Sequence, residues 1–111
     1  MSGNSYRKTS MYKPLPSEVT VKESKIDGLG LFTTEPIEKE HVFGITHIQH
    51  DDFQHGYIRT PLGGFINHSE KPNCILINEG TSAWSYMKLK SLYFIREDEE
   101  LTLTYSLYGI L

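Results

Sequence analysis

Residues 65–74 read "FINHSEKPNC" and place a dense group of hydrogen-bonding side chains directly after an apolar pair. A Pro-Asn turn follows, and the segment ends on Cys74, the single cysteine of the chain. A protein of 111 residues buries little surplus apolar surface, so a polar cluster beside its core needs a structural or chemical reason. The partners of this segment should therefore lie elsewhere in the sequence.

The composition is that of one globular domain. Hydrophobic residues make up 38% and charged residues 23%, which argues against disorder and against a membrane protein. No apolar stretch is long enough for a transmembrane helix or a signal peptide. A single cysteine cannot form an internal disulfide, and no C-x-x-C pair is present to hold zinc. We therefore expect an intracellular protein, cytoplasmic or nuclear, without a metal site.

The charge is distributed unevenly. Residues 1–17 carry three basic side chains and no acidic one, whereas residues 18–111 hold 8 basic and 14 acidic side chains, a balance of −6. We expect residues 1–17 to be a flexible arm and residues 18–111 to form the domain. An acidic domain disfavours nucleic acid as a partner and suits a basic peptide or protein.

Short alternating and β-branched runs predict a mostly β fold of seven or eight strands. A hairpin connection is expected at residues 78–81, because Gly80 can adopt a positive φ. Residues 49–60 come closest to a helix, but at most one helical turn is expected. The predicted strands are residues 19–24, 30–34, 41–48, 74–78, 82–89, 91–95 and 101–105.

Two charged segments have similar sequences. Residues 36–43, "PIEKEHVF", and residues 94–101, "FIREDEEL", each place an isoleucine before a charged run and then return to apolar residues. The pattern predicts two similar turns that lead into strands. The simplest interpretation of each is a solvated turn.

A Gly-x-Gly pair occurs in "KIDGLGLF" at residues 25–32. Such a pair lets backbone amides approach a ligand closely, and it is equally typical of a plain β-turn. The third glycine and the following helix of a dinucleotide-binding fingerprint are missing. The pair therefore indicates either a turn or a cofactor loop of another kind.

Nucleophilic and metal sites receive little support from spacing. His68 and Ser69 are adjacent in sequence and seldom could face each other, and no G-x-S-x-G is present. Cys74 is expected to be a small buried side chain at the start of a strand. The histidines match no closed zinc pattern; they are His41, His47, His50, His55 and His68.

The C-terminal segment "EDEELTLTYSLYG", residues 97–109, runs from an acidic turn into an alternating strand. The strand ends on Tyr105, and Tyr108 follows three residues later. These tyrosines could be core aromatics with hydroxyls in water, or they could line a pocket. Spacing alone does not decide between the two.

Taken together, these segments resemble the SET domain of protein lysine methyltransferases over residues from about Val19 to Tyr108. "KIDGLGLF" looks like the K-x-x-G-x-G-L-F motif of that family. "FINHSEKPNC" matches R-F-x-N-H-S-x-x-P-N, with Gly64 in place of the leading arginine. "DEELTLTY" is similar to G-E-E-L-T-x-D-Y, whose last residue is the catalytic tyrosine. Three motifs in the right order argue against a chance match.

The resemblance implies a β-clip-like SET fold of small sheets, in which the C-terminal strand threads beneath a loop as a pseudoknot. It also implies S-adenosyl-L-methionine as cofactor and a basic lysine-containing protein or peptide, such as a histone tail, as substrate. A second copy of the chain could close the site, as a homodimer. By resemblance Tyr105 is catalytic; the cofactor-binding residues are Gly28, Leu29, Gly30, Asn67, His68 and Tyr105, and the substrate-channel candidates are Tyr108, Tyr86, Trp84 and Leu103.

Several positions depart from the family pattern. Glu40 and Asp98 stand where the family usually has glycine, so these turns could differ in shape. Leu103 replaces the Phe or Tyr that helps to limit the degree of methylation, which leaves the product open. The cysteine clusters of the pre-SET and post-SET modules are missing, and the insert after Ile48 is short.

Two other functions remain open at this point. The first is a non-catalytic SET-like module that binds a basic peptide, against which the retained Asn67, His68 and Tyr105 argue. The second is a β-clip protein with a structural or sugar-binding role, which would lack the threaded C-terminus.

Overall fold

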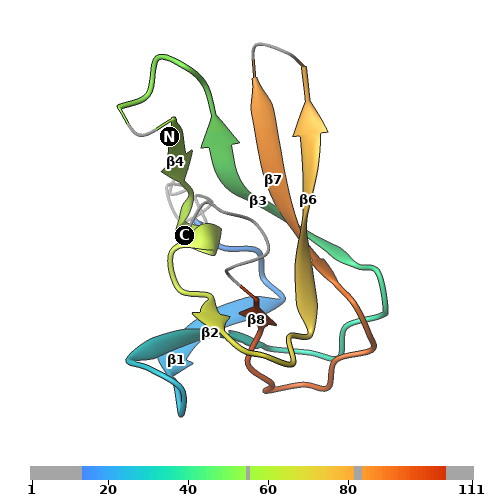
Figure 1. Cartoon of the computed structure of the whole chain (residues 1–111). Helices are drawn as coiled ribbons and strands as arrows, with labels where there is room; N and C mark the ends of the chain where they lie inside the picture. The colour runs from blue at the N-terminus through green and yellow to red at the C-terminus, as the bar shows by residue number, and fades with distance from the viewer. Residues whose placement is uncertain (1–13, 55, 82–83, 105–111) are drawn as a thin grey trace, which may run out of the picture.

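The computed structural model of the chain describes residues 14–54, 56–81 and 84–104 (Figure 1). These residues form three small sheets and are mostly β, as the sequence predicts. The four-stranded sheet has the order β4-β3-β7-β6, while β1 pairs with β2 and β5 pairs with β8. The elements are β1 (Val19–Glu23), β2 (Leu29–Thr33), β3 (Val42–Gln49), β4 (Tyr57–Arg59), the 3-10 helix η2 (Pro61–Gly63), β5 (Asn67–His68), β6 (Cys74–Gly80), β7 (Ser85–Ser91) and β8 (Thr102–Leu103).

The predicted hairpin is present, but its connection lies after Gly80 rather than at residues 78–81. Strand β6 continues to Gly80, which has a φ of 125°, and Thr81 N donates to Trp84 O at 2.7 Å. A Cβ at Gly80 would clash with the carbonyl of Trp84. Glycine is therefore needed here for its conformation and for the close approach of the two backbones.

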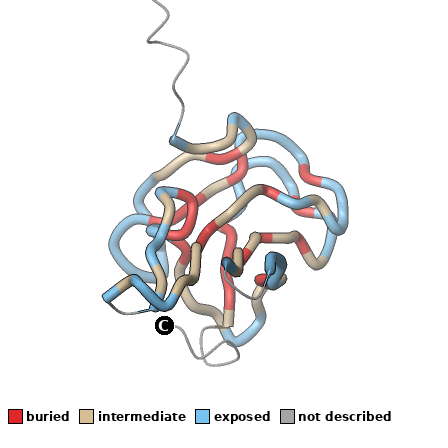
Figure 2. Tube along the Cα trace, turned by 90° about the horizontal axis from the view of Figure 1, so that it is seen from above, coloured by how far each residue is buried: buried red, intermediate tan, exposed pale blue. Residues whose placement is uncertain are grey.

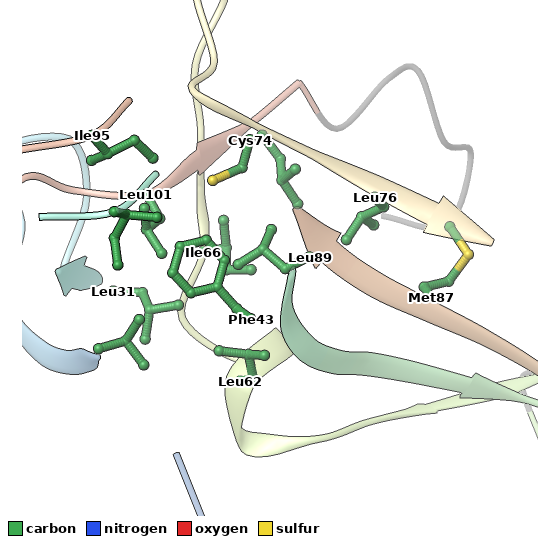
Figure 3. Packing of buried hydrophobic residues seen from close by; sticks show 13 residues of the cluster. Leu31, Phe43, Leu62, Ile66, Cys74, Leu76, Met87, Leu89, Ile95 and Leu101 are labelled. Atoms are coloured by element: carbon green, nitrogen blue, oxygen red, sulfur yellow. The ribbon is translucent and has the colours of Figure 1, made fainter. Parts of the chain in front are cut away.

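The core lies between the inner face of the four-stranded sheet and the two smaller sheets. In β7 the inward residues Met87, Leu89 and Ser91 are buried, and the residues between them are half-buried, which is the period of a strand with one face on the core. Leu31, Leu89 and Leu101 are fully buried, and each contributes about 2 kcal/mol of hydrophobic stabilisation. Figure 3 shows these side chains packed together, and Figure 2 shows exposed stretches along the outer parts of the trace.

Parts of the predicted secondary structure were wrong. Residues 91–95 do not form a strand, because β7 ends at Ser91 and Ile95 makes an isolated bridge. Residues 49–60, where no strand was predicted, contain β4. The expected single helical turn follows them as η2. Strands this short carry too few residues for periodicity to reveal them. The described part of the chain has no helix long and apolar enough to cross a membrane.

The two similar charged segments form equivalent turns that pair with each other. Ile37 N donates to Ile95 O at 2.8 Å, and Ile95 N donates to Ile37 O at 2.9 Å. Glu40 and Asp98 each have a φ of 66°, so both adopt the left-handed conformation that usually needs glycine. Glu40 and Asp98 therefore replace the usual glycine but still adopt the positive φ that favours glycine.

The parallel pair β5–β8 joins the central polar segment to the C-terminal segment. Asn67 lies opposite Thr102, and His68 lies opposite Leu103. Ser69 N donates to Leu103 O at 2.8 Å, and Thr104 Oγ1 donates to Ser69 O at 2.7 Å. This pairing agrees with the resemblance; the threading of a pseudoknot stays a prediction.

The predicted boundary after residue 17 also stays a prediction, because residues 1–13 lie outside the described residues. The last residues of the predicted arm do contact the domain. Leu15 packs against the core, and Val19 N donates to Pro16 O at 3.2 Å.

A buried histidine lies at the centre of the four-stranded sheet. His47 is 1% exposed, and its Nδ1 lies 2.8 Å from Thr46 Oγ1. Because Thr46 Oγ1 donates its own hydrogen to Met87 O at 3.0 Å, it accepts from Nδ1, and the proton of the neutral ring is on Nδ1. His47 Nε2 has no hydrogen-bond partner within the described part of the chain. Burial, assisted by nearby Arg59, lowers the pKa of His47 to about 4.

The substitution Glu40→Gly should stabilise the protein by about 1 kcal/mol, because it removes the steric cost of a side chain at a φ of 66°. Chemical denaturation at pH 7 measures this difference. Glu38→Gly is the matched control, since Glu38 is exposed in the same turn and is not among the positive-φ residues, so that substitution should destabilise. Equal destabilisation by both substitutions would contradict the strained-turn assignment.

Acid should destabilise the fold through His47. The unfolded chain binds this proton near pH 6.5 and the folded chain only near pH 4, so the unfolded state holds more protons between these values and stability falls as the pH falls through that window. The shift corresponds to about 3 kcal/mol. Urea unfolding at pH 7, 5.5 and 4.5 should show a shallower loss of stability for His47→Phe than for the native sequence. An identical pH dependence of the two proteins would exclude His47 as the source.

Candidate functional site

The side chain of Asn67 is the meeting point of the three sequence motifs. Its Nδ2 donates to Asp27 O at 3.1 Å, in the glycine-containing loop before β2, and to Leu29 O at 3.2 Å, at the first residue of β2. The same Nδ2 donates to Glu100 Oε2 at 2.8 Å, just before β8. One half-buried amide at the start of β5 therefore connects segments that are 33 to 40 residues away from it in sequence.

The two glycines of the loop serve different purposes. Gly28 has a φ of 47°, and a Cβ there would meet no atom within 4 Å. A Cβ at Gly30 would instead clash with the carboxylate of Glu100. Gly30 therefore makes room for a side chain of this chain, whereas Gly28 borders open space that a ligand could enter.

Glu100 was not among the predicted site residues, because the run "EDEE" is typical of a solvated turn. Its carboxylate accepts hydrogen bonds from Ser24 Oγ at 2.8 and 2.9 Å and from Asn67 Nδ2. Ser24 Oγ in turn accepts from Ile26 N at 2.8 Å and from Asp27 N at 3.3 Å. We call these three side chains, Ser24, Glu100 and Asn67, the Ser24–Glu100–Asn67 network. The one sequence signal for Glu100 is its position directly before the alternating strand, two residues after the turn.

Asn73 attaches the end of the polar segment to the same place. Its Nδ2 donates to Glu100 O at 2.8 Å, and its Oδ1 accepts from Thr102 N at 2.9 Å. Asn73 N donates to Thr102 Oγ1 at 3.2 Å. The amide of Asn73 thus satisfies backbone groups at the entry of β8, as a neighbouring strand would.

His68 and Ser69 have different partners. His68 Nε2 lies 2.9 Å from Glu70 Oε2, and Ser69 Oγ accepts from Lys71 N at 3.0 Å in a local turn. These contacts place Ser69 in a local turn and His68 beside Glu70. Cys74 is 1% exposed, and burial raises the pKa of its thiol to about 12, so it is not a thiolate nucleophile at neutral pH.

Of the predicted channel residues, the structure brings Leu103 to the site. Leu103 is 1% exposed and lies opposite His68 in the β5–β8 pair. Trp84 and Tyr86 lie at the other end of the β6–β7 hairpin, remote from the end where Cys74 pairs with Ser91 (Figure 1).

The ring of Trp84 stacks on His50 with a centroid distance of 4.1 Å and lies 6.0 Å from Phe53. Trp84 and Tyr86 are therefore not brought together with Asn67. Tyr105 and Tyr108, the other two predicted aromatic residues, lie outside the described residues.

The loop and the Asn67 segment lie side by side and leave space for a small ligand at Gly28. Gly28 and Leu29 are exposed beside the half-buried Asn67 and His68, and the hydrogen bonds of Asn67 hold these two segments edge to edge. Leu29 is 49% exposed and offers an apolar contact to a ligand on the loop. Within the described residues no group of three His, Cys, Asp or Glu side chains could hold a metal ion.

A hollow lies near Glu100. This cavity of about 410 Å³ has a mixed charged lining, and Lys22, which forms an ion pair with Asp98, lies 4.8 Å above the ring of Phe32. Its lining residues are Lys22, Glu23, Lys25, Phe32, Asp98 and Glu100. Glu100 therefore contributes to this hollow as well as to the contacts of Asn67.

Comparison with known proteins identifies the fold. The SET domain family model matches residues 45–106, which is more than half of the chain and includes the Asn67 segment and β8. The sequence has no match among curated proteins.

Solved structures agree with the family match. A Plasmodium falciparum protein named as a histone methyltransferase superposes with a TM-score of 0.65 at 21% identity, over 79% of this chain and 92% of that one. An Ezh2 mutant of apo ctPRC2 gives a TM-score of 0.64 at 18% identity, over 81% of this chain. A humanized Chaetomium thermophilum Polycomb Repressive Complex 2 with a bound inhibitor gives 0.63 at 20% identity, also over 81%.

This chain spans 15% of each of the two Polycomb chains. At these identities the likeness to solved structures establishes the fold. The family match, which is independent of them, establishes membership: the chain belongs to the SET domain family.

Proposed function

We propose that this protein transfers a methyl group from S-adenosyl-L-methionine to the ε-amine of a lysine in a protein substrate. The observation that carries the proposal is the position of Asn67. In a chain of the SET domain family, its amide joins the Gly28 loop to Glu100, which lies two residues before β8, and Tyr105 follows the end of β8 by two residues in the sequence. The hydrogen bonds of Asn67 thereby bring together the three sequence motifs, at residues 25–32, 65–74 and 98–105.

Gly28, Leu29, Gly30, Asn67 and His68 would hold the cofactor. The open space at Gly28 and the exposure of Leu29 support this assignment. S-adenosyl-L-methionine supplies a methyl group activated by a sulfonium. The protein has mainly to align the reacting atoms and to receive the amine without its proton.

Tyr105 is the proposed catalytic residue, with Tyr108 as a candidate wall of the lysine channel. Free lysine has a pKa of about 10.4, and a narrow apolar channel lowers it because burial disfavours the ammonium form. The hydroxyl of Tyr105 could then orient the neutral amine. Leu103, two residues earlier in the sequence, is apolar and buried, so it would narrow the channel without adding a hydroxyl.

An acidic surface supports a basic substrate. Glu18, Glu35 and Glu38 line a hollow of about 290 Å³ together with His41, which forms a pair with Glu18 at 2.7 Å. Such a surface would attract lysine-rich segments in solution. Because the structural neighbours include a protein named as a histone methyltransferase, histone tails are the first substrates to test, and a nuclear location would follow.

The remaining parts of the proposal concern assembly. The C-terminal segment would thread beneath residues 66–73 as a pseudoknot, and a second copy of the chain would complete the channel. The alternative is a non-catalytic module that binds a basic peptide without turning it over. Calorimetry with S-adenosyl-L-methionine separates the two, because a site that binds no cofactor cannot methylate.

The substitution Tyr105→Phe should lower methyl transfer by about 10²-fold or more, because it removes the hydroxyl that orients the amine. Incubation with labelled cofactor, a panel of histones and whole-cell lysate measures the transfer. Tyr93→Phe is the matched control, since Tyr93 is 60% exposed in a connecting segment and should leave the rate unchanged.

Undiminished methylation of a good substrate by the Tyr105→Phe protein would show that the assignment of Tyr105 is wrong. Failure of the native protein to bind S-adenosyl-L-methionine at all would instead exclude the enzyme and favour the peptide-binding module.

A further inference from the structure

We propose that Glu100 is a positioning residue: through Ser24 and Asn67 it fixes the shape of residues 24–29, the loop that would receive the cofactor. Its effect on the loop follows from contacts in the described structure, and its effect on cofactor affinity rests on the proposed function. The residue acts through its neighbours and does not itself need to touch the cofactor.

The hydrogen bonds of the network have one consistent direction. Ile26 N and Asp27 N donate to Ser24 Oγ, and Ser24 Oγ donates to the Glu100 carboxylate. From the other side, Asn67 Nδ2 donates to the same carboxylate and also to the carbonyls of the loop. The Glu100 carboxylate is therefore the common acceptor for Ser24 on one side and for Asn67 on the other.

The donors on both sides of Glu100 favour a carboxylate over an amide at this position. A carboxylate accepts at both oxygens, whereas the amide of a glutamine accepts at one and donates at the other. Asn67 Nδ2 and Ser24 Oγ both contact Oε2, and Ser24 Oγ also contacts Oε1. A glutamine with its carbonyl in the place of Oε2 would put its NH₂ group in the place of Oε1, facing Ser24 Oγ, which already accepts from two backbone amides. The isosteric replacement Glu100→Gln therefore removes the charge and the Oε1 contact of the network while it preserves the volume of the side chain.

The placement of Glu100 shows how closely the loop is fitted to it. The carboxylate occupies the space above Gly30 that a Cβ would fill, and the Cβ of Ser24 would lie 3.1 Å from that same atom. Ser24 N also donates to Gly28 O at 2.8 Å, which closes the turn that holds Gly28 at its positive φ. Loss of the carboxylate contacts should thus free the turn where the open space for a ligand lies.

Hydrogen exchange of the cofactor-free full-length chain tests the positioning role directly. Glu100→Gln should speed exchange of the Ser24, Ile26 and Asp27 amides by about tenfold relative to the native protein, because these amides depend on the network. Amides of the β3–β7 ladder should change less. Glu97→Gln removes the same charge from an exposed position of the same turn and should leave the loop unchanged.

Unchanged exchange in the loop of Glu100→Gln would overturn the proposal. An equal rise in the loop and in the β3–β7 ladder would also overturn it, because that result indicates global destabilisation. Ser24→Ala provides a second route, since it leaves Glu100 and Asn67 in place and should speed exchange of Ile26 and Asp27 alone.

Calorimetry with S-adenosyl-L-methionine then tests the link to the cofactor. Glu100→Gln should weaken binding by about tenfold, while Glu97→Gln should bind like the native protein. Equal binding by Glu100→Gln and the native protein would overturn the positioning role. Lack of binding by the native protein would refute the proposed function, and the exchange measurement would still decide whether Glu100 shapes the loop.

Discussion

The pairing of β5 with β8 is the contact on which the candidate site depends. It involves only four residues, yet it places Asn67 beside Glu100 and ends one residue before the segment that contains Tyr105. Two-residue strands have little stability of their own. The side-chain amides of Asn67 and Asn73 supply the additional hydrogen bonds, and the burial of Leu101 and Leu103 supplies the apolar contact.

This dependence explains why so much polar chemistry lies directly beside the core. Side chains of "FINHSEKPNC" form hydrogen bonds with backbone groups of other segments. In a domain with such short strands, regular sheet pairing does not provide partners for these backbone groups. A polar side chain that replaces a missing ladder bond avoids the cost of a buried, unpaired peptide group. The two equivalent turns also satisfy backbone groups outside regular ladders. Glu40 and Asp98 adopt a strained, positive φ in these turns, and Ile37 and Ile95 form backbone hydrogen bonds with each other.

Much of the fold could be predicted from the sequence, and the limits have physical causes. Strands such as β1 and β7 carry enough alternation to be recognised, and β8 lies within the predicted strand 101–105. In contrast, β4 and β5 are three and two residues long, were not predicted, and are defined by their partners. The resemblance located Gly28, Gly30 and Asn67 in the site, but it did not give the different roles of the two glycines. The role of Gly30 depends on Glu100, 70 residues later, and an acidic run beside a turn has no local signal of burial. Trp84 and Tyr86 were chosen for their aromatic chemistry, and the length of the hairpin carries them to its far end.

If the Gly28 loop and the Asn67 segment form a single cofactor site, both should respond together to S-adenosyl-L-methionine. A titration of the isotopically labelled protein, followed by amide chemical shifts, tests this. Saturable shifts are expected at Gly28, Leu29, Gly30, Asn67 and His68, with little change at Trp84 and Tyr86. Shifts centred on the hairpin end, or no saturable shift anywhere, would exclude a single site at these two segments.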